Sequence, residues 1–417
     1  MSPRQKASGF ILHLASQSPA DAMFVISIAA LKRNTAILRE VKEAAGCHLV
    51  LALKGFSCWK AFKYIQDDLD GCCASGLWEG LLARDHFKKH VITYSPAYDE
   101  NDIAELCDFT DHLDFNSLSQ WFRFREMVMA HPRFKSGALQ CGLRVNPEHS
   151  TGATPIYDPC VAGSRLGITA EQLEGADLTG LSGLHFHTLC EQDSDDLGTT
   201  LAAVDTKFGH LLRSPQFKYL NMGGGHWITK PFYDRDRLIR LVRETQEKYN
   251  VDVWLEPGEA IAIHTGVLRA TVMDVFESAG HKLAILSISA TAHMPDVMEM
   301  PYRPDVFLVD TAASDADTKP AVTFPGENYH PAGESGEHTY RLGGPTCLAG
   351  DVVGDFSFPR PLKVGDTLVF DDMAHYTMVK TTTFNGVKHP AIALQHEDGS
   401  LEIIREFGYP DFRDRLA

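Results

Sequence analysis

Short apolar runs alternate with amphipathic segments through the first two thirds of the chain. Residues 23–28 favour a strand, and residues 29–45 carry apolar side chains at helical spacing and end at Gly46. Helical segments also occupy residues 118–129 and 236–249. The further strand-like runs are 47–54, 71–74, 91–94, 112–115, 141–145, 183–186, 219–222 and 251–256. This repeat predicts a parallel (β/α)8 barrel, and hence the α/β fold class.

The pattern changes after about residue 265. Residues 265–277 and 282–290 alternate between apolar and polar positions, and turn residues separate further strand-like runs at 367–370 and 401–404. Such alternation is typical of antiparallel strands. We therefore expect a barrel over residues 25–265 and an antiparallel β domain formed by residues 1–24 with 266–417.

Composition narrows the class of partner. The chain has 39 basic and 55 acidic residues, a net charge of −16 and no polybasic block, which argues against nucleic acid and favours a cationic ligand. No apolar stretch approaches the roughly 20 residues that a membrane helix needs. The nine cysteines are odd in number and lack zinc-ribbon spacing, which favours a reducing, cytoplasmic location.

Unusual polar groups follow several predicted barrel strands, where the active sites of such barrels lie. Lys54 ends an apolar run, and a desolvated lysine there is suited to Schiff-base chemistry, although a surface charge is the simpler interpretation. Three glycines at 223–225 let backbone N–H groups approach a phosphate, or simply form a tight turn. Both interpretations stay open at this point.

Glu256 ends another apolar run before a rigid Pro-Gly pair. If the phosphate belongs to pyridoxal phosphate, a carboxylate there would keep the ring nitrogen protonated; alternatively, it forms a salt bridge with a neighbouring loop. His187 would lie flat against the ring and Cys190 would face the phosphate, unless both only fill the barrel mouth. In the second domain, Cys347 is a candidate proton donor and Tyr376 a candidate phosphate ligand, or else an ordinary loop residue and a barrel cap.

The pair His185 and His187 also admits a metal centre of the barrel metallohydrolase type, with Cys190 and Glu191 nearby. Those enzymes place such a pair on their first strand, whereas here it follows about 180 residues of chain. No matching carboxylate pattern surrounds His226 or His264. We therefore predict no metal.

Together these motifs resemble the fold type III pyridoxal-phosphate decarboxylases, whose members act on ornithine, arginine and diaminopimelate. The detail is most similar to the carboxynorspermidine/carboxyspermidine decarboxylases. The strings that carry this resemblance over nearly the whole chain are residues 51–56, 159–167, 184–191, 255–260, 292–296 and 344–351. The resemblance implies an alanine racemase-type barrel, pyridoxal 5'-phosphate as cofactor and a homodimer with shared active sites.

The resemblance also implies roles for single residues. Lys54 would hold the cofactor covalently, His187 would stack on its ring, and Glu256 would pair with its nitrogen. Cys347 would return a proton to the α-carbon, and with Asp351 it would complete the partner's active site. The residues expected to hold the phosphate are Gly224, Gly225 and Tyr376.

Two departures from the wider family bear on the substrate. Glu259 stands where relatives carry an arginine, and Leu348 stands where they carry an acid. We expect Glu259 and Asp296 to bind the amines of a longer polycation, although Asp296 also suits a helix N-cap. No arginine in these motifs suits the distal carboxylate of diaminopimelate.

The resulting expectation is decarboxylation of carboxynorspermidine and/or carboxyspermidine to norspermidine or spermidine in polyamine biosynthesis. Three alternatives remain: a diaminopimelate or basic amino-acid decarboxylase of the same fold, a non-catalytic relative that binds pyridoxal phosphate, and the metallohydrolase.

Overall fold

The computed structural model describes residues 22–417 apart from 153, 301, 310–321 and 324–337. The chain divides into two compact units. Lys32–Ile261 form one, and the chain up to Leu31 joins Ala262–Ala417 in the other. The predicted division at residue 265 lies close to the second boundary. Residues 1–21, which we assigned to the β domain, lie outside the described residues.

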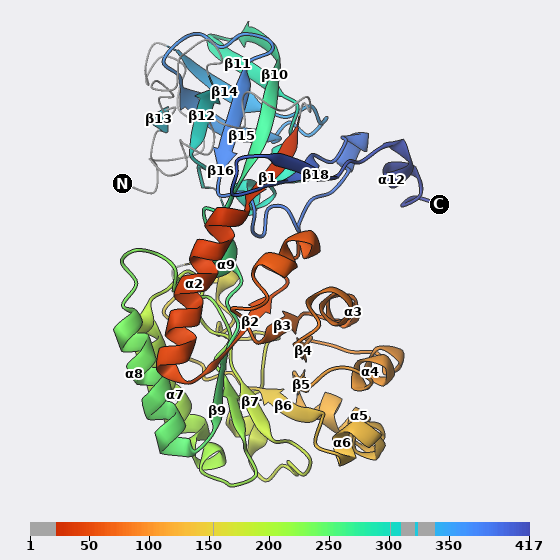
Figure 1. Ribbon diagram of the computed structural model, residues 1–417, viewed down its shortest axis with the longest axis vertical. Helices are drawn as coiled ribbons and strands as arrows, with labels where there is room; N and C mark the ends of the chain where they lie inside the picture. Colours follow the sequence, from red (N-terminus) through yellow and green to blue (C-terminus); the bar gives the residue numbers. More distant parts are fainter. Residues whose placement is uncertain (1–21, 153, 301, 310–321, 324–337) are drawn as a thin grey trace. The chain divides into compact units, whose positions relative to one another are not determined.

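Eight parallel strands close into a barrel in the first unit, as predicted, and β9 pairs with β2 to complete the ring (Figure 1). Because these strands are covered on both faces, they form continuous apolar runs rather than alternating patterns. The barrel strands are β2 (His48–Ala52), β3 (Gly71–Ala74), β4 (His90–Tyr94), β5 (His112–Phe115), β6 (Gln140–Arg144), β7 (Gly183–His185), β8 (Tyr219–Asn221) and β9 (Asp252–Leu255).

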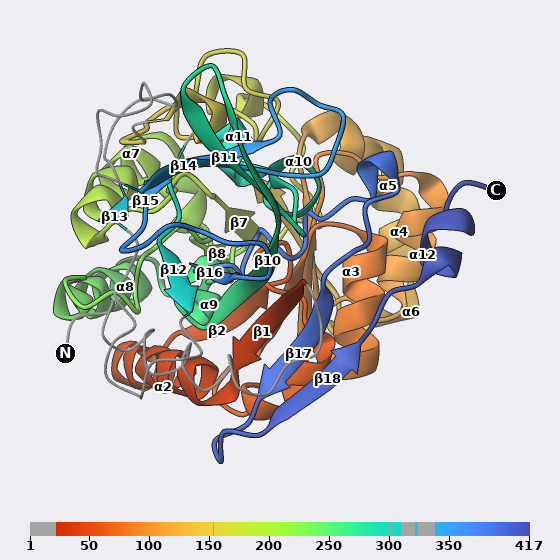
Figure 2. The same cartoon turned by 90° about the horizontal axis from the view of Figure 1, so that it is seen from above.

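Helices connect the barrel strands, and Figure 2 shows α3 to α6 on one side of the ring and α7 and α8 on another. The predicted helices at 118–129 and 236–249 are confirmed within one residue at each end. The helices of this part of the chain are α2 (Ile28–Ala45), α3 (Leu77–Leu82), α4 (Glu100–Cys107), α5 (Leu118–Ala130), α6 (Pro132–Lys135), α7 (Ser194–Leu212), α8 (Arg235–Tyr249) and α9 (Glu259–Ala262).

The first strand, β1 (Met23–Ser27), differs from the prediction. It pairs antiparallel with β10 and parallel with β17, so it belongs to the sheet rather than to the start of the barrel. Phe24 packs into one apolar cluster of the sheet unit, whereas Met23 and Val25 pack into another. With both faces buried, β1 carries the same continuous apolar pattern as a barrel strand, and the sequence could not distinguish the two.

The second unit contains the predicted β domain, a ten-stranded and mostly antiparallel sheet in which only β1/β17 and β11/β14 pair in parallel among the described residues. The predicted strands at 367–370 and 401–404 are confirmed. Its further elements are β10 (Gly266–Ser278), β11 (His281–Leu286), β12 (Val306–Val309), β13 (Val322–Thr323), β14 (Thr339–Gly343), β15 (Val352–Ser357), β16 (Thr367–Asp371), β17 (Ala391–Gln395), β18 (Leu401–Arg405), α10 (Ala290–His293), α11 (Asp296–Glu299) and α12 (Tyr409–Arg413). In the part of the chain that the structure describes, no helix is long and apolar enough to span a membrane.

Candidate active site

Lys54 follows β2 instead of ending it. The sequence predicted a strand that runs up to Lys54, but the strand ends two residues before it. The strand ends at Ala52, Leu53 is buried, and Lys54 is exposed. Its position is therefore a turn at the barrel mouth rather than a desolvated strand end. Gly55 makes this turn possible, because a Cβ there would lie 3.0 Å from the Cα of Gly258 in the loop after β9.

His187 faces this lysine. Its Nε2 lies 3.4 Å from the Nζ of Lys54, and its Nδ1 accepts a hydrogen bond of 2.9 Å from the backbone N–H of Gly224. Burial, followed by the positive charges of Lys54 and Arg144, holds the pKa of His187 well below its ordinary value. The ring is therefore a neutral imidazole with a fixed orientation.

The three glycines after β8 form a close-packed turn. Gly223 and Gly225 have φ values of +67° and +84°, which glycine adopts readily. A Cβ would lie 2.3 Å from the carbonyl oxygen of Glu256 at Gly224, and 2.0 Å from the carbonyl oxygen of Leu189 at Gly225. The turn thus brings backbone close to the site, as an anion cradle requires. The N–H of Gly224, however, already has an acceptor in His187.

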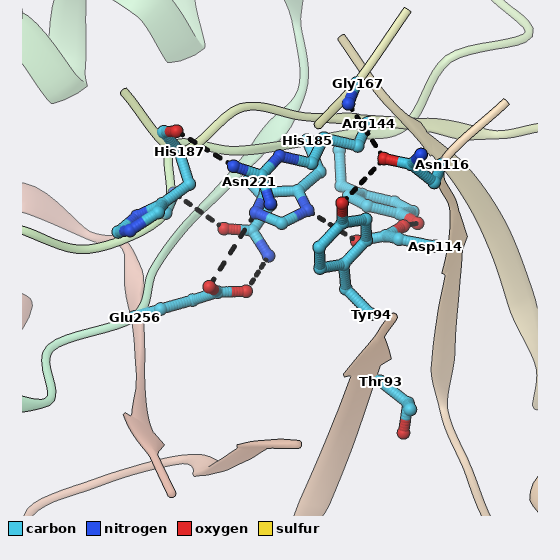
Figure 3. A network of polar contacts seen from close by, with 12 residues as sticks. Thr93, Tyr94, Asp114, Asn116, Arg144, Gly167, His185, His187, Asn221 and Glu256 are labelled. Carbon is cyan, nitrogen blue, oxygen red and sulfur yellow. Dashed lines mark hydrogen bonds and ion pairs between the residues drawn. The ribbon is translucent and has the colours of Figure 1, made fainter. Parts of the chain in front are cut away.

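Glu256 is 5% exposed and directly follows β9. Its Oε1 accepts a hydrogen bond of 2.5 Å from Asn221 Nδ2, and its Oε2 lies 3.7 Å from His185 Nε2 (Figure 3). Burial raises the pKa of Glu256, but His185, Asn221 and Lys54 outweigh this effect and hold the pKa below its ordinary value. The carboxylate is therefore charged at neutral pH.

Asn221 links the carboxylate to the glycine turn. While its amide donates to Glu256, its Oδ1 accepts a hydrogen bond of 2.9 Å from the N–H of Gly223. Gly224 next to it holds His187. The positions of Glu256 and His187 are consequently set by one continuous set of contacts.

A cavity of about 620 Å³ opens beside these groups. Its walls include Lys54, His187 and Glu256, together with the loop of residues 155–166 that contains one of the motifs noted in the sequence. Asn116 holds this loop: its Nδ2 donates to the Arg165 carbonyl at 2.8 Å, and its Oδ1 accepts from the Gly167 N–H at 2.8 Å. The barrel thus brings three predicted site residues together around one space.

Cys190 and Glu259 belong to the same unit. Cys190 is exposed as a residue, but its thiol is partly covered. This partial desolvation, with the negative charges of Glu191 and Glu259, raises the pKa of the thiol to about 11, so the thiol stays neutral. The indole Nε1 of Trp227 donates a hydrogen bond of 3.0 Å to Glu259 Oε1. Neither observation tests the roles predicted for these two residues.

The remaining predicted residues lie in the sheet unit. Asp351 is 3% exposed and accepts hydrogen bonds from the hydroxyls of Ser289 at 2.9 Å and Thr346 at 2.7 Å, and from the N–H of Thr291 at 3.1 Å. Its carboxylate is therefore engaged within its own chain and closes the loop that carries Cys347. Cys347 itself is exposed, and its N–H donates to the Asn385 side chain at 3.0 Å.

Asp296 begins α11 and pairs with Lys380, which also donates to Glu299 at 2.6 Å. The helix has Pro295 at its N-cap, so Asp296 is not the cap that the sequence allowed. Tyr376 is half-buried and has a φ of +37°, a conformation that non-glycine residues rarely adopt.

The two histidines of the His-x-His motif do not share one environment. His185 lies between Asp114 and Glu256 (Figure 3). His187 contacts Lys54 and Gly224. Within the described residues, no group of three potential ligands is placed to hold a metal ion. The pair thus serves two separate sets of contacts.

Sequence reasoning missed the buried polar residues beneath the cavity. Asp114 on β5 is fully buried, Asn221 ends β8, and Arg144 ends β6, where its guanidinium lies 4.6 Å from the Tyr94 ring. A polar side chain inside or at the end of an otherwise apolar barrel strand was the available signal. These residues connect the predicted groups rather than standing in recognisable motifs.

Comparisons with known proteins place this chain in a family. A model of the pyridoxal-dependent decarboxylases, described as their C-terminal sheet domain, matches residues 24–374. The carboxyaminopropylagmatine decarboxylase of Synechocystis sp. is 43% identical over 395 residues, 94% of this chain and 95% of the relative. The carboxynorspermidine/carboxyspermidine decarboxylase of Campylobacter jejuni is 41% identical over 396 residues, 95% and 97% of the two chains.

Comparison with solved structures gives the same family. The carboxynorspermidine decarboxylase of Campylobacter jejuni, in complex with norspermidine, has a TM-score of 0.80 and 39% identity, covering 94% of this chain and 99% of that one. The diaminopimelate decarboxylase of Helicobacter pylori, with a TM-score of 0.76 and 14% identity, shares the fold. The predicted resemblance, fold class and enzyme class are confirmed: the chain belongs to the pyridoxal-dependent decarboxylases of the alanine racemase-like fold.

Proposed function

We propose that this protein decarboxylates carboxynorspermidine and/or carboxyspermidine with pyridoxal 5'-phosphate and releases norspermidine or spermidine together with CO₂. The observation that carries the proposal is the meeting of Lys54, His187 and Glu256 around one cavity of about 620 Å³. Relatives with 41% and 33% identity are named for these substrates, which supports the choice.

The residues present fit the cofactor. When bound, pyridoxal phosphate would supply an electron sink for the carbanion left by CO₂. The amine of Lys54 would hold its aldehyde, the neutral ring of His187 would lie against its ring, and charged Glu256 would keep its nitrogen protonated. Beside the phosphate we place Gly225 and the neutral thiol of Cys190, together with Tyr376. Gly224 acts mainly by orienting His187 through their hydrogen bond.

The thiol of Cys347 would return the proton to the carbon that loses CO₂, and we propose that a homodimer shares its active sites in this way. Asp351 would hold the Cys347 loop. Mixing K54A and C347A variants tests the idea, since a statistical mixture of dimers should recover roughly a quarter of the wild-type activity. No recovery from a mixture that forms mixed dimers would refute shared sites.

For the substrate amines we propose Glu259 and Asp296, carboxylates suited to ammonium groups. Each already has a partner, Trp227 and Lys380 respectively, so substrate binding would replace these contacts. E259Q and D296N should therefore raise KM for the polyamine precursor more than they lower kcat. An unchanged KM in both variants would remove these residues from the proposal.

Carboxyaminopropylagmatine is a second candidate substrate, because a relative with 43% identity is named for it. It differs in having a guanidinium group, which a carboxylate can bind in a bidentate manner. Side-by-side kcat/KM values for the three precursors, with diaminopimelate as a fourth compound, separate the candidates. The highest value for the agmatine derivative would transfer the proposal to that substrate.

The decisive experiment is an absorbance spectrum of the purified protein before and after borohydride, followed by a CO₂ release assay. We expect a yellow protein whose reduced chromophore stays attached to the peptide containing Lys54, and a K54A variant that lacks it. A colourless wild type with an unchanged K54A variant would refute the proposal. Location in the cytoplasm stays a prediction, which cell fractionation would test.

A further inference from the structure

His185 lies between two buried carboxylates in the barrel interior. Its Nδ1 is 3.5 Å from Asp114 Oδ2, and its Nε2 is 3.7 Å from Glu256 Oε2 (Figure 3). At the outer ends of this row, the Tyr219 hydroxyl donates to Asp114 Oδ1 at 2.7 Å, and Asn221 donates to Glu256 Oε1 at 2.5 Å. The five side chains form one series of contacts that starts and ends on β8 and passes through β5, β7 and the end of β9.

Three atoms in this series lack any closer partner. Asp114 Oδ2 and both ring nitrogens of His185 are buried and have no hydrogen-bond partner within the part of the chain that the structure describes. Buried polar atoms are nearly always paired. These atoms face each other and Glu256. The protons of Asp114 and His185 must therefore lie within the Asp114–His185 and His185–Glu256 contacts.

Three proton arrangements can satisfy both contacts. One places a proton on Glu256 and the charge on Asp114, which conflicts with the pKa of Glu256, held below its ordinary value; two remain. In one, Asp114 and Glu256 are both anions and His185 is an imidazolium, which buries three charges. In the other, protonated Asp114 donates to Nδ1, and the Nε2–H of a neutral His185 donates to Glu256. We propose that the second of these two arrangements holds. Asp114 and His185 are then uncharged positioning residues that fix the orientation of the Glu256 carboxylate. Glu256 carries the single negative charge of these three side chains.

The surroundings favour this arrangement. Burial raises the pKa of Asp114 to about 7 and lowers the pKa of His185 to about 4. His185 is faced by Asp114, Glu256, the Arg144 guanidinium and the Tyr94 ring at 5.2 Å, with the charge of Lys54 also acting on it. Both cations oppose an imidazolium at this position.

Two glycines of the barrel strands leave room for the hydrogen bond between Tyr219 and Asp114. A Cβ at Gly142 would lie 2.0 Å from Asp114 Oδ1 and 2.3 Å from the Tyr219 hydroxyl. A Cβ at Gly183 would lie 1.9 Å from the same tyrosine ring. Only glycine leaves room at these positions for Tyr219 to reach Asp114, which shows that their contact is built into β6 and β7.

The functional consequence rests on the proposed binding of pyridoxal phosphate. A carboxylate at the ring nitrogen is useful only while it stays charged, because a neutral acid cannot hold the nitrogen protonated. Asn221 donates to one oxygen of Glu256, and Nε2 of His185 lies 3.7 Å from the other. In the proposed arrangement His185 carries no positive charge that would neutralise the carboxylate. The charge therefore remains for the cofactor.

Affinity of the cofactor-free protein for pyridoxal phosphate, followed by absorbance, tests the proposal without an activity assay. D114N is the discriminating variant: its new amide N–H can donate to Nδ1 of His185 while its oxygen accepts from Tyr219, so Kd should stay within about twofold. D114L removes both contacts and should weaken binding roughly tenfold. Equal weakening by D114N and D114L would overturn the proposal, because it would mean that Asp114 acts as an anion.

A matched pair of tyrosine variants separates positioning from stability. Y219F removes the donor to Asp114, whereas Y98F removes a buried hydroxyl that lies 3.2 Å from the Thr93 and Asp114 carbonyls. Both should lower the unfolding midpoint to a similar degree, but only Y219F should weaken cofactor binding. A similar loss of affinity in Y98F would overturn the positioning role.

The protonation state can also be read directly from wild-type protein by ¹⁵N NMR of its histidines, with the His185 signals assigned by their absence in H185F. We expect a neutral ring with the proton on Nε2 between pH 5 and 6, where Asp114 keeps its proton and His185 has lost its positive charge. An imidazolium throughout this range would overturn the proposal even if every variant failed to fold. If the protein binds no pyridoxal phosphate, the proposed function fails, while this spectrum still decides the protonation of His185.

Discussion

Asp351 in the sheet unit and Glu256 in the barrel are both almost completely buried carboxylates, yet their contacts differ. Asp351 accepts hydrogen bonds from two hydroxyls and from backbone N–H groups on either side of its loop. Glu256 accepts a hydrogen bond of 2.5 Å from Asn221, lies 3.7 Å from His185 and borders the cavity whose walls include Lys54. The comparison indicates that a carboxylate enclosed by donors of its own loop holds structure, whereas one that borders a cavity can act on a ligand.

The largest difference between Glu256 and Asp351 should appear in variants that remove the charge of one or the other side chain. E256Q keeps the shape of the side chain but loses its charge, and we expect kcat/KM to fall roughly 10²- to 10³-fold, as for other electrostatic groups at reacting centres. Its unfolding midpoint should fall less than that of D351A, because Oε1 of the glutamine can still accept the hydrogen bond from Asn221. Activity within tenfold of the wild type would break the comparison.

D351A should show the opposite pattern. Several donors would lose their acceptor at once, so the free energy of unfolding should fall by about 2–4 kcal/mol in urea denaturation. T291A is the matched control, because Thr291 donates to Asp351 through its backbone, which the substitution leaves in place. Equal destabilisation by both variants would argue against the loop-holding role of Asp351.

Asp114 is a third buried carboxylic acid, and its contribution to the free energy of unfolding should depend on pH. Its pKa is about 7 in the folded protein, above the ordinary value of 3.8, so the folded state binds the proton more tightly than the unfolded state. Its contribution to stability is full below about pH 4 and is lost as the pH rises through 7, by about 2–4 kcal/mol. The difference between wild type and D114N isolates this effect from that of the histidines. A difference that does not vary with pH would contradict the raised pKa.

Asn116 is the barrel's counterpart to Asp351, since it holds the cavity loop through the Arg165 carbonyl and the Gly167 N–H. N116A should release that loop and raise KM roughly tenfold with a smaller effect on kcat, measured by steady-state kinetics. Y94F, which removes only the 2.6 Å hydrogen bond to Asn116, should have a smaller effect. An unchanged KM in N116A would mean that the loop does not contact the substrate.

Much of the site was predictable because it follows barrel strands. Short apolar runs identified β2, β7 and β9, and the polar residues just after them include Lys54, His187 and Glu256. The contacts among these residues were not predictable. Asn221 and Asp114 lie on strands far from Glu256 and His185 in sequence, and only closure of the barrel brings them together.

The burial of individual side chains was also beyond the sequence. Lys54 was expected to be desolvated but is exposed, and the sequence did not predict that donors of its own unit surround the carboxylate of Asp351. Strand β1 shows the same limit, because its apolar residues suit any strand that is covered on both faces. Hydrophobicity reports that a residue is buried, but not which neighbours bury it.

The sequence alone therefore established the βα repeat, the sheet-forming second part and the order of motifs that identify the decarboxylase family. These features are local, because strand length, apolar periodicity and turn residues act over a few positions. The tertiary structure alone established which polar atoms meet inside the barrel and which of these side chains are buried. Pairing and pKa depend on distances and burial, which arise only when strands distant in sequence close around the same space.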